Sequence, residues 1–308
     1  MRNAFVNKLT ELCRGNDKII LLVGDIGFGV FEDFKKEFPE RYFNMGIAEQ
    51  NSVGVVSGLA KEGFIPVFYT IIPFLIFRPF EQIRNDLCIN RRKALLVGVG
   101  AGLSYGALGP THHSLEDVAV MSSLPDVSIY TPSSPVMVGP SLEEAIKTEL
   151  GPTYIRLGKN GELNLKMDAV LTLKWTPIRF KNPGGKILIL THGPIAKLVE
   201  TVVEELGLDN LITFGIVERI KPFPKLEFSR EAKNCKIMIT VEENYSVGSL
   251  LEKTLIVLNE IDSPAKVHSI NVPHRFITEV GSQEEILEII KMSKSHIISR
   301  IREIISDA

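Results

Sequence analysis

The stretch RYFNMGIAEQNSVG (residues 41–54) places an acidic residue, Glu49, at the start of a predicted helix. That helix spans AEQNSVGVVSGLAKEG (48–63), where apolar or small residues recur at helical spacing and Gly63 supplies a suitable end. A carboxylate buried between an apolar strand and an apolar helical face costs free energy unless it is paired or used. Glu49 is therefore a candidate functional residue. The alternative is a structural acid that the helix dipole favours in the first turn.

Around this stretch, short apolar runs alternate with helical patterns. The runs predict strands buried on both faces, as in a parallel sheet: KIILLVGD (18–25), IPVFYT (65–70), KALLVGVG (93–100), DVSIYTP (126–132) and TYIRLG (153–158). The helical patterns PFEQIRNDLCINR (79–91) and SSPVMVGPSLEEAIKTEL (133–150) lie between them. This alternation predicts a doubly wound α/β domain over residues 1–157.

A second series of the same kind follows a hairpin-like linker over residues 158–185. Its predicted strands and helices are KILILTHG (186–193), AKLVETVVEELG (196–207), LITFGIVE (211–218), KIMITVEE (236–243), a helix from Ser246, VHSINV (267–272) and a final helix from Ser282. The expected fold class is α/β, with two doubly wound parallel-sheet domains, the second over residues 186–308.

Composition and charge argue against several classes of protein. The 308 residues carry a formal net charge of −2 without a basic stripe, which argues against nucleic-acid binding. Three widely spaced cysteines predict no disulfide framework, and Arg2, Lys8 and Glu11 leave no room for a secretory signal. The longest apolar run (64–77) is broken by two prolines and is shorter than the roughly 20 residues of a membrane-spanning helix. We expect a soluble, cytoplasmic protein.

Sites in such sheets form beyond the carboxyl ends of the strands. The loops expected there are GDIGFG (24–29), FNMGIAEQ (43–50), YTIIPF (69–74), GAGLSYGALGPTHH (100–113) and TPSSP (131–135). The first loop does not fit the dinucleotide pattern G-x-G-x-x-G. The pair His112 and His113 lacks a third ligand in register, so we predict no metal site in this chain.

Together these loops resemble one family. NMGIAEQN (44–51), IIPFLIFRPFEQIRND (71–86) and GPTHHSLEDVAVMSSLPDVSIYTPSS (109–134) are similar to the pyrimidine-binding domain of transketolases and of the related 1-deoxyxylulose-5-phosphate synthases. KILILTHGPIAKLVETVVEEL (186–206) and IMITVEENYSVGSL (237–250) resemble the third domain of that family. The resemblance covers nearly the whole chain, in the right order, and corresponds to the C-terminal half of a transketolase.

The resemblance implies thiamine diphosphate as cofactor. Glu49 would hydrogen-bond N1′ of its aminopyrimidine, which favours the imino tautomer whose N4′ removes the thiazolium C2 proton. Phe74, Phe77 and Phe80 would supply aromatic faces for the pyrimidine, although the same spacing is typical of a core stripe. Asp25 takes the position of the family's acidic residue near the cofactor, and its alternative is a turn-forming aspartate.

The resemblance also implies residues that bind the substrate. His112 would face the reacting carbon as a catalytic and substrate-binding residue, and Lys159 lies where the family has a basic residue. Arg156 is a further candidate for binding an anion, with a salt bridge as the alternative. Leu108 and Gly100 depart from the family, which has an aspartate and a histidine there. Either the acceptor differs from the usual aldose phosphates, or partner residues hold it.

The family's diphosphate-binding domain, with its G-D-G motif, has no counterpart in this sequence. The resemblance therefore implies a split enzyme, in which a second polypeptide holds Mg²⁺ (or Ca²⁺) and the diphosphate, as an α2β2 heterotetramer. The expected activity is transfer of a two-carbon ketol group from a ketose to an aldehyde. The alternatives are a β subunit of a 2-oxo acid dehydrogenase, a deoxyxylulose-phosphate-synthase-like subunit, and a non-catalytic regulatory or assembly subunit.

Overall fold

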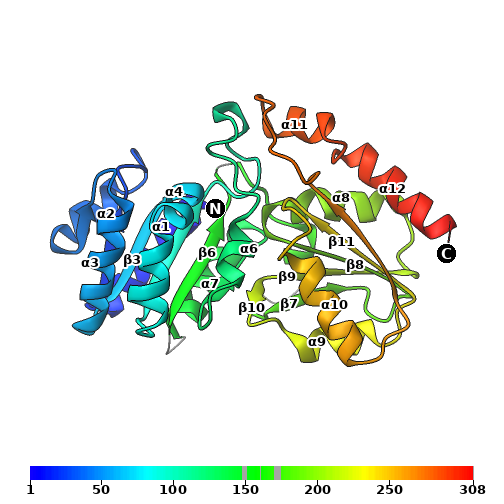
Figure 1. Cartoon of the computed structure of the whole chain (residues 1–308), viewed down its shortest axis with the longest axis horizontal. Coiled ribbons are helices and arrows are strands. Elements are labelled where there is room, and N and C mark those ends of the chain that lie inside the picture. Colours follow the sequence, from blue (N-terminus) through cyan, green and yellow to red (C-terminus); the bar gives the residue numbers. More distant parts are fainter. Residues whose placement is uncertain (148–150, 160, 170–174, 308) are drawn as a thin grey trace.

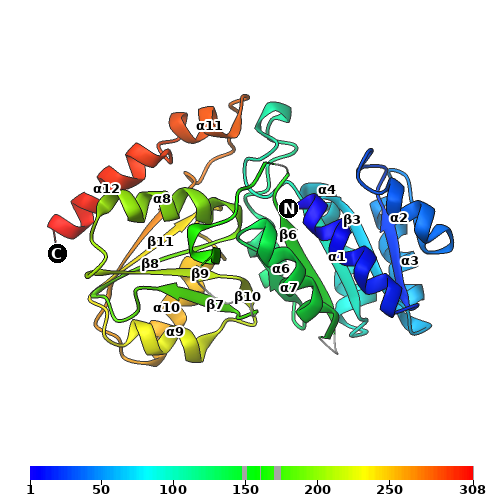
Figure 2. The ribbon, with the colours of Figure 1, turned by 180° about the vertical axis from the view of Figure 1, so that it is seen from behind.

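The chain folds into two α/β domains that lie side by side. The computed structural model describes residues 1–147, 151–159, 161–169 and 175–307. The first domain, blue to green in Figure 1, and the second, yellow-green to red, each have a sheet with helices on both faces. The view from behind in Figure 2 shows the same two layered units.

The first sheet has seven strands in the order β10-β5-β6-β4-β3-β1-β2. Their bounds are β1 (Ile19–Val23), β2 (Tyr42–Asn44), β3 (Ile65–Ile71), β4 (Ala94–Val99), β5 (Ser128–Tyr130), β6 (Pro152–Leu157) and β10 (Arg219–Lys221). Strands β1, β3, β4 and β6 are buried along their whole length, as their continuous apolar runs predict. All neighbours are parallel except β10, which runs antiparallel to β5.

Helices cover both faces of this sheet. Their bounds are α1 (Arg2–Gly15), α2 (Glu32–Glu37), α3 (Glu49–Lys61), α4 (Ile72–Phe77), α5 (Phe80–Gln82), α6 (Asp117–Ser122) and α7 (Pro135–Lys147), with the short η1 (Pro39–Arg41), the π-helical η2 (Ile83–Cys88) and η3 (Gly106–Leu108). Helices α1, α2 and α7 pack into one apolar core, and α3, α4, α6 and η2 into another. Helix α3 ends before Gly63, whose φ of +87° suits glycine, as predicted.

The second sheet has five strands in the order β12-β11-β8-β9-β7. Its strands are β7 (Ile178–Lys181), β8 (Ile187–His192), β9 (Ile212–Val217), β11 (Ile237–Glu242) and β12 (Lys266–Asn271). Its helices are η4 (Lys166–Ala169), η5 (Gly193–Ile195), α8 (Ala196–Leu206), α9 (Lys225–Ala232), α10 (Leu250–Glu260), α11 (Gln283–Ile289) and α12 (Lys294–Ser306). Helices α8, α11 and α12 share one core.

The structure departs from the sequence-based expectations mainly at edges. Strand β7 lies inside the predicted linker and pairs antiparallel with β9, so the second sheet, like the first, is mixed rather than wholly parallel. The predicted final helix is two helices, and the helix expected from Ser246 begins at Leu250. Edge strands β2 and β10 and helices α1, α2 and α9 were not predicted. Parts of the linker (160, 170–174), the end of the second crossover helix (148–150) and residue 308 lie outside the described residues.

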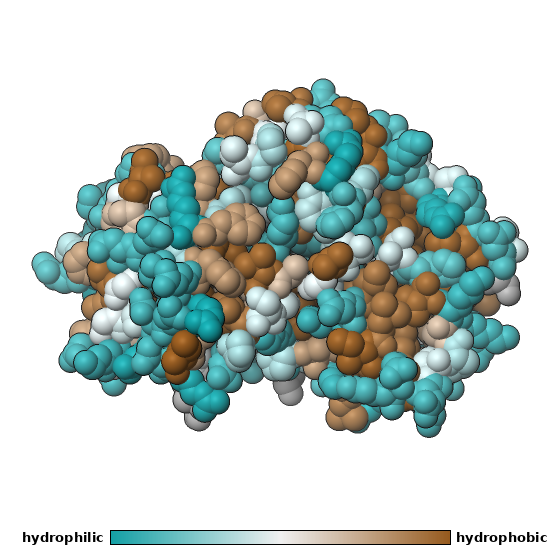
Figure 3. Space-filling view, viewed as in Figure 1, coloured by the Kyte–Doolittle hydropathy of each residue, from teal (hydrophilic) through white to brown (hydrophobic). Residues whose placement is uncertain are grey.

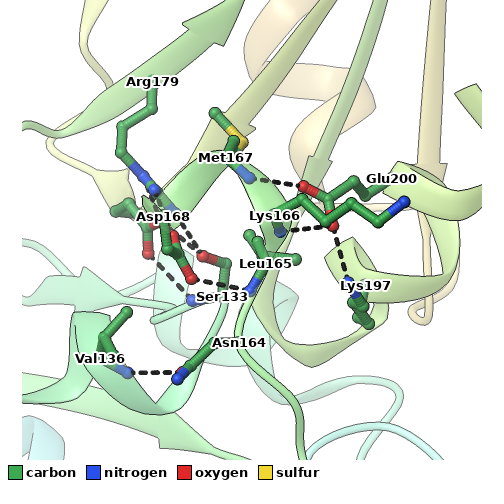
Figure 4. A network of polar contacts seen from close by, with 11 residues as sticks. Ser133, Val136, Asn164, Leu165, Lys166, Met167, Asp168, Arg179, Lys197 and Glu200 are labelled. Carbon is green, nitrogen blue, oxygen red and sulfur yellow. Dashed lines mark hydrogen bonds and ion pairs between the residues drawn. The ribbon is translucent and has the colours of Figure 1, made fainter. Parts of the chain in front are cut away.

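Strand β10 and Arg179 are two of the features that join the domains. Strand β10 follows β9 and completes the edge of the first sheet, where Thr131 donates its backbone N–H to Glu218 O at 2.8 Å. Beside it, buried Arg179 of β7 donates to Glu218, Asp168 and Ser133 (Figure 4). The described residues contain no helix long and apolar enough to span a membrane.

Candidate active site

Five strands of the first sheet direct their carboxyl ends to one edge, and the candidate residues follow them. Asp25 follows β1, Glu49 follows β2, Phe74 follows β3, His112 lies in the loop after β4, and Lys159 follows β6. This is the edge at which α/β sheets form their sites. The sequence-based prediction of these loops therefore agrees with the topology.

Glu49 is the first residue of α3 and is only 4 % exposed. The turn before it is shaped by Asn44, whose side-chain oxygen accepts the backbone N–H of Gly46 at 2.9 Å. The buried carboxylate is paired: Arg78 Nη1 lies 3.0 Å from Oε1 and 2.9 Å from Oε2. The cost of burying Glu49 is thus offset by a cation, and that cation comes from just beyond α4.

Phe74 is the aromatic residue that reaches this pair. The Arg78 guanidinium carbon lies 4.0 Å from the centre of the Phe74 ring, and the His112 ring meets the same ring edge-on at 5.1 Å. Phe77, by contrast, is 43 % exposed, and Phe80 is half-buried against the core. Of the three predicted phenylalanines, Phe74 has the contacts expected of a cofactor-stacking residue, whereas Phe77 and Phe80 as cofactor ligands stay predictions.

The adjacent histidines, His112 and His113, lie in different environments. His112 is half-buried beside Phe74 and its Nδ1 lies 3.0 Å from Thr111 Oγ1. Burial, and then the positive charge of Arg78, lower the pKa of His112 from its ordinary value. His113 is buried, and desolvation lowers its pKa as well. His112 is therefore the member of the pair that faces the candidate site, and its neutral ring is suited to accept a proton.

We expect the His112 ring to titrate with a midpoint below 6.5 in the free chain, because burial and Arg78 both disfavour its charged form and so lower its pKa. An NMR pH titration checks this, with the His112→Gln spectrum identifying the resonance. Replacing Arg78 with methionine removes the second cause, so the midpoint should rise in Arg78→Met. A midpoint at or above 6.5 in the unaltered chain would contradict the expectation.

Tyr105 is a site residue that the sequence analysis missed. Its ring lies 6.1 Å from the His112 ring, and Lys159 Nζ lies 4.7 Å from its centre. A Cβ at Gly100 would stand 2.2 Å from Tyr105 Cδ2, so the tyrosine fills the space that a side chain at position 100 would need. The departure at Gly100, where the family has a histidine, was the one available signal.

Lys159 also lines a cleft of about 590 Å³ between the two domains, together with Ser104, Lys197 and Gln283. An anion-binding role for Lys159 stays a prediction. Asp25 is exposed at the end of β1 with φ +50°, and it accepts a hydrogen bond from Asn44 Nδ2 at 3.0 Å. That bond links Asp25 to the turn before Glu49.

Arg156 does not have the surroundings predicted for an anion ligand. It is 1 % exposed, and its Nε donates to Asp117 at 2.8 Å while Nη2 donates to the carbonyl of Ser114 at 2.9 Å. Tyr154 and Asn244 donate to the same aspartate, so a buried network holds the guanidinium. The alternative, a salt bridge, is what the structure has. A buried salt bridge therefore takes the place of the expected role of Arg156 in substrate binding.

The chemistry of the pocket suits an aminopyrimidine. Such a ring needs a hydrogen-bonding carboxyl at its edge and an aromatic face against its plane, and Glu49 and Phe74 present these on either side of the Arg78 guanidinium. The described residues hold no group of three His, Cys, Asp or Glu that could ligate a metal ion.

Comparisons with known proteins agree with this geometry. The family model "Transketolase, pyrimidine binding domain" matches residues 1–161. The chain is 33% identical over 264 residues to an apulose-4-phosphate transketolase subunit from Actinobacillus succinogenes, covering 83% of each. It is 30% identical over 307 residues to the 1-deoxy-D-xylulose-5-phosphate synthase of Halalkalibacterium halodurans, with 98% of this chain covering 48% of that protein. The chain therefore spans about half the length of that relative.

Solved structures give the same picture. A split-gene transketolase, described as an inactive beta4 tetramer, superposes with a TM-score of 0.84 at 27% identity, over 98% of this chain and 96% of that one. The transketolase of Campylobacter jejuni superposes with a TM-score of 0.82 at 17% identity, over 98% of this chain and 46% of that one, which bears on the fold alone. The predicted resemblance and the α/β fold class are confirmed.

Proposed function

This chain belongs to the transketolase family, and we propose that it is the pyrimidine-side subunit of a split, thiamine-diphosphate-dependent enzyme. The reaction we propose is transfer of a two-carbon ketol group from a ketose to an aldehyde. One observation carries the proposal: a buried carboxylate, Glu49, begins a helix at the carboxyl edge of the sheet and pairs with Arg78, whose guanidinium stacks on Phe74, the ring that His112 meets edge-on.

When bound, the cofactor supplies a carbon nucleophile at its thiazolium ring. The chain's own groups bind and orient it. Glu49 offers a carboxyl oxygen to the ring nitrogen N1′, and Phe74 offers its face to the pyrimidine plane. His112, neutral at neutral pH because its pKa is lowered, can accept a proton from a substrate hydroxyl. Lys159 and Tyr105 border the space beyond His112, where a substrate anion or hydroxyl would lie.

The proposal includes a partner subunit that holds the diphosphate through Mg²⁺. Large apolar side chains stand exposed in the segments that follow β1, β2 and β3: Phe28 is 82 % exposed, Ile47 75 % and Phe77 43 %. Such exposed apolar area marks a surface that another polypeptide covers. A further apolar area is seen over the second domain, at the lower right of Figure 3. We propose an α2β2 assembly in the cytoplasm, with the active site between subunits.

A second candidate is the condensation of pyruvate with an aldehyde, as the relationship to 1-deoxy-D-xylulose-5-phosphate synthases suggests. The two reactions differ in the donor, a ketose or a 2-oxo acid. They share the pyrimidine site, so the geometry around Glu49 does not separate them. Assays with a ketose and with pyruvate as the donor distinguish the two reactions.

The test is isothermal titration of thiamine diphosphate and Mg²⁺ into this chain alone, and then into its mixture with a diphosphate-binding subunit carrying the G-D-G motif. We expect heat of binding only in the mixture, followed by cleavage of xylulose 5-phosphate. Pyruvate decarboxylation instead would favour the second candidate. Full binding by the chain alone would contradict the split site, and a mixture that assembles without binding would contradict the proposed cofactor role.

A substitution at position 108 tests how the acceptor substrate is bound. Leu108 is 53 % exposed, and no hydroxyl of a sugar can donate a hydrogen bond to it. We expect Leu108→Asp to lower KM for aldose phosphate acceptors by about tenfold, since one added hydrogen bond to a charged acceptor is worth about 1.5 kcal/mol. The measurement is KM across a panel of sugar phosphates. Ala107→Asp, an exposed neighbour, is the matched control, and an unchanged panel would contradict the importance of position 108.

A further inference from the structure

Arg78 occupies the space between the two groups that define the pyrimidine site. Its Nη1 donates to both oxygens of Glu49, at 3.0 and 2.9 Å, while its guanidinium stacks 4.0 Å from the centre of the Phe74 ring. A guanidinium is planar, donates hydrogen bonds from its edge and stacks by its face. These are the two contacts that the proposed function expects of the aminopyrimidine, made here by a side chain of the protein itself.

The two partners differ in their access to solvent. The Glu49 side chain is 3 % exposed, whereas the Arg78 side chain is 44 % exposed. Both line an opening of about 500 Å³ together with Ile47, Ala48, Gln50 and Asn51. Arg78 can therefore leave Glu49 by rotating toward water, but Glu49 cannot leave Arg78 without moving the start of α3.

We propose that Arg78 fills the pyrimidine site of the free chain and exchanges with the aminopyrimidine ring when the cofactor binds. The proposal rests on the proposed function of Glu49. It adds that Arg78 competes with the cofactor rather than holding it. Before binding, Arg78 gives the buried carboxylate a partner, which an empty pocket would lack. On binding, the ring takes over both contacts and the guanidinium returns to solvent, where hydration compensates it.

Competition between Arg78 and the cofactor predicts the direction in which the affinity for thiamine diphosphate changes when Arg78 is removed. If Arg78 must be displaced, removing it removes a cost of binding, and thiamine diphosphate binds more tightly. If Arg78 instead supports Glu49 or touches the ring, removing it weakens binding. The variants are Arg78→Met, which keeps length and apolar contact with Phe74 without the charge, and Arg78→Gln, which keeps a hydrogen-bond donor. Arg84→Met is the matched control, because Arg84 is an exposed cation in η2 whose Nη1 pairs with Asn85.

The measurement is the Kd of thiamine diphosphate, at saturating Mg²⁺, for the complex of each variant with the diphosphate-binding subunit. Arg78→Met removes a half-exposed ion pair and one cation–π contact that the cofactor otherwise has to break. We therefore expect its Kd to be about three- to tenfold smaller. Arg78→Gln should fall between, and Arg84→Met should match the unaltered protein. In a Glu49→Gln background the effect of Arg78→Met should shrink, because the ion pair is already gone and only the cation–π contact with Phe74 remains to be lost.

A Kd in Arg78→Met that is equal to or larger than that of the unaltered protein overturns the proposal. So does a tightening that is undiminished in the Glu49→Gln background. Failure of the proposed function looks different: the unaltered complex would then bind no thiamine diphosphate at all. Thermal unfolding of each complex without cofactor shows whether a variant assembles, and Arg78→Gln provides a second reading if Arg78→Met does not.

Discussion

Replacing Glu49 with glutamine is expected to lower the ketol-transfer rate of the assembled enzyme by about a thousandfold, the scale of a lost general acid–base group. Glutamine preserves the size of the side chain and its place at the start of α3, but it has no carboxyl to share a proton with a ring nitrogen. The rate of xylulose 5-phosphate cleavage measures the loss. Exchange of the thiazolium C2 proton for deuterium, followed by NMR, should slow by a similar factor.

The matched control is Glu62→Gln, at the other end of the same helix, which should leave both rates unchanged. Equal activity of Glu49→Gln and the unaltered protein would favour the alternative of a non-catalytic regulatory or assembly subunit. Loss of activity together with loss of assembly would show only a structural effect. The association of the two subunits is therefore measured on the same samples.

The largest expected effect on stability is at Arg179. Its guanidinium is buried and bonds Glu218 at 2.6 Å, Asp168 at 2.6 Å and Ser133 at 2.8 Å (Figure 4). Replacing it with methionine leaves two buried carboxylates without their cation. We expect Arg179→Met to lower the free energy of unfolding by about 3–5 kcal/mol. Urea unfolding followed by circular dichroism measures this.

Arg300→Met is the control for removing an arginine as such. Arg300 pairs with Glu303 at 3.0 Å on the exposed face of α12, and its loss should change the free energy of unfolding by about 0–1 kcal/mol. Because Arg179 links both domains, the Arg179→Met transition should also separate into two steps. A single transition at the position of the Arg300→Met transition would contradict the role given to this network.

Sequence reasoning succeeded where chemistry depends on local order. The buried strands are continuous apolar runs, and their carboxyl ends fix where the loops gather, so the loops that hold Glu49 and His112 could be placed from the sequence. The roles of the two residues come from the resemblance and stay predictions. The three phenylalanines do not share one helix, because α4 ends at Phe77 and a new segment begins after Pro79. That break leaves Phe74 alone against His112.

The remaining residues could not be predicted because their partners are distant in sequence. Nothing near Arg78 in the chain indicates that it pairs with Glu49, 29 positions away. Tyr105 is positioned by the absence of a side chain at Gly100, and Arg156 by Asp117, 39 positions earlier. Burial of Arg156 in particular reverses its expected role, since a strand-end arginine gives no sign of which side of the sheet edge it will reach.

Strand β10 has a consequence for how the protein is made. The first sheet receives its last strand from residues 219–221, after three of the five strands of the second sheet have been synthesised. During translation, the edge of β5 therefore remains open while β7, β8 and β9 emerge from the ribosome. An open edge invites pairing with other chains. Nascent chains stalled before residue 219 should therefore expose the β5 edge, and full-length chains should not.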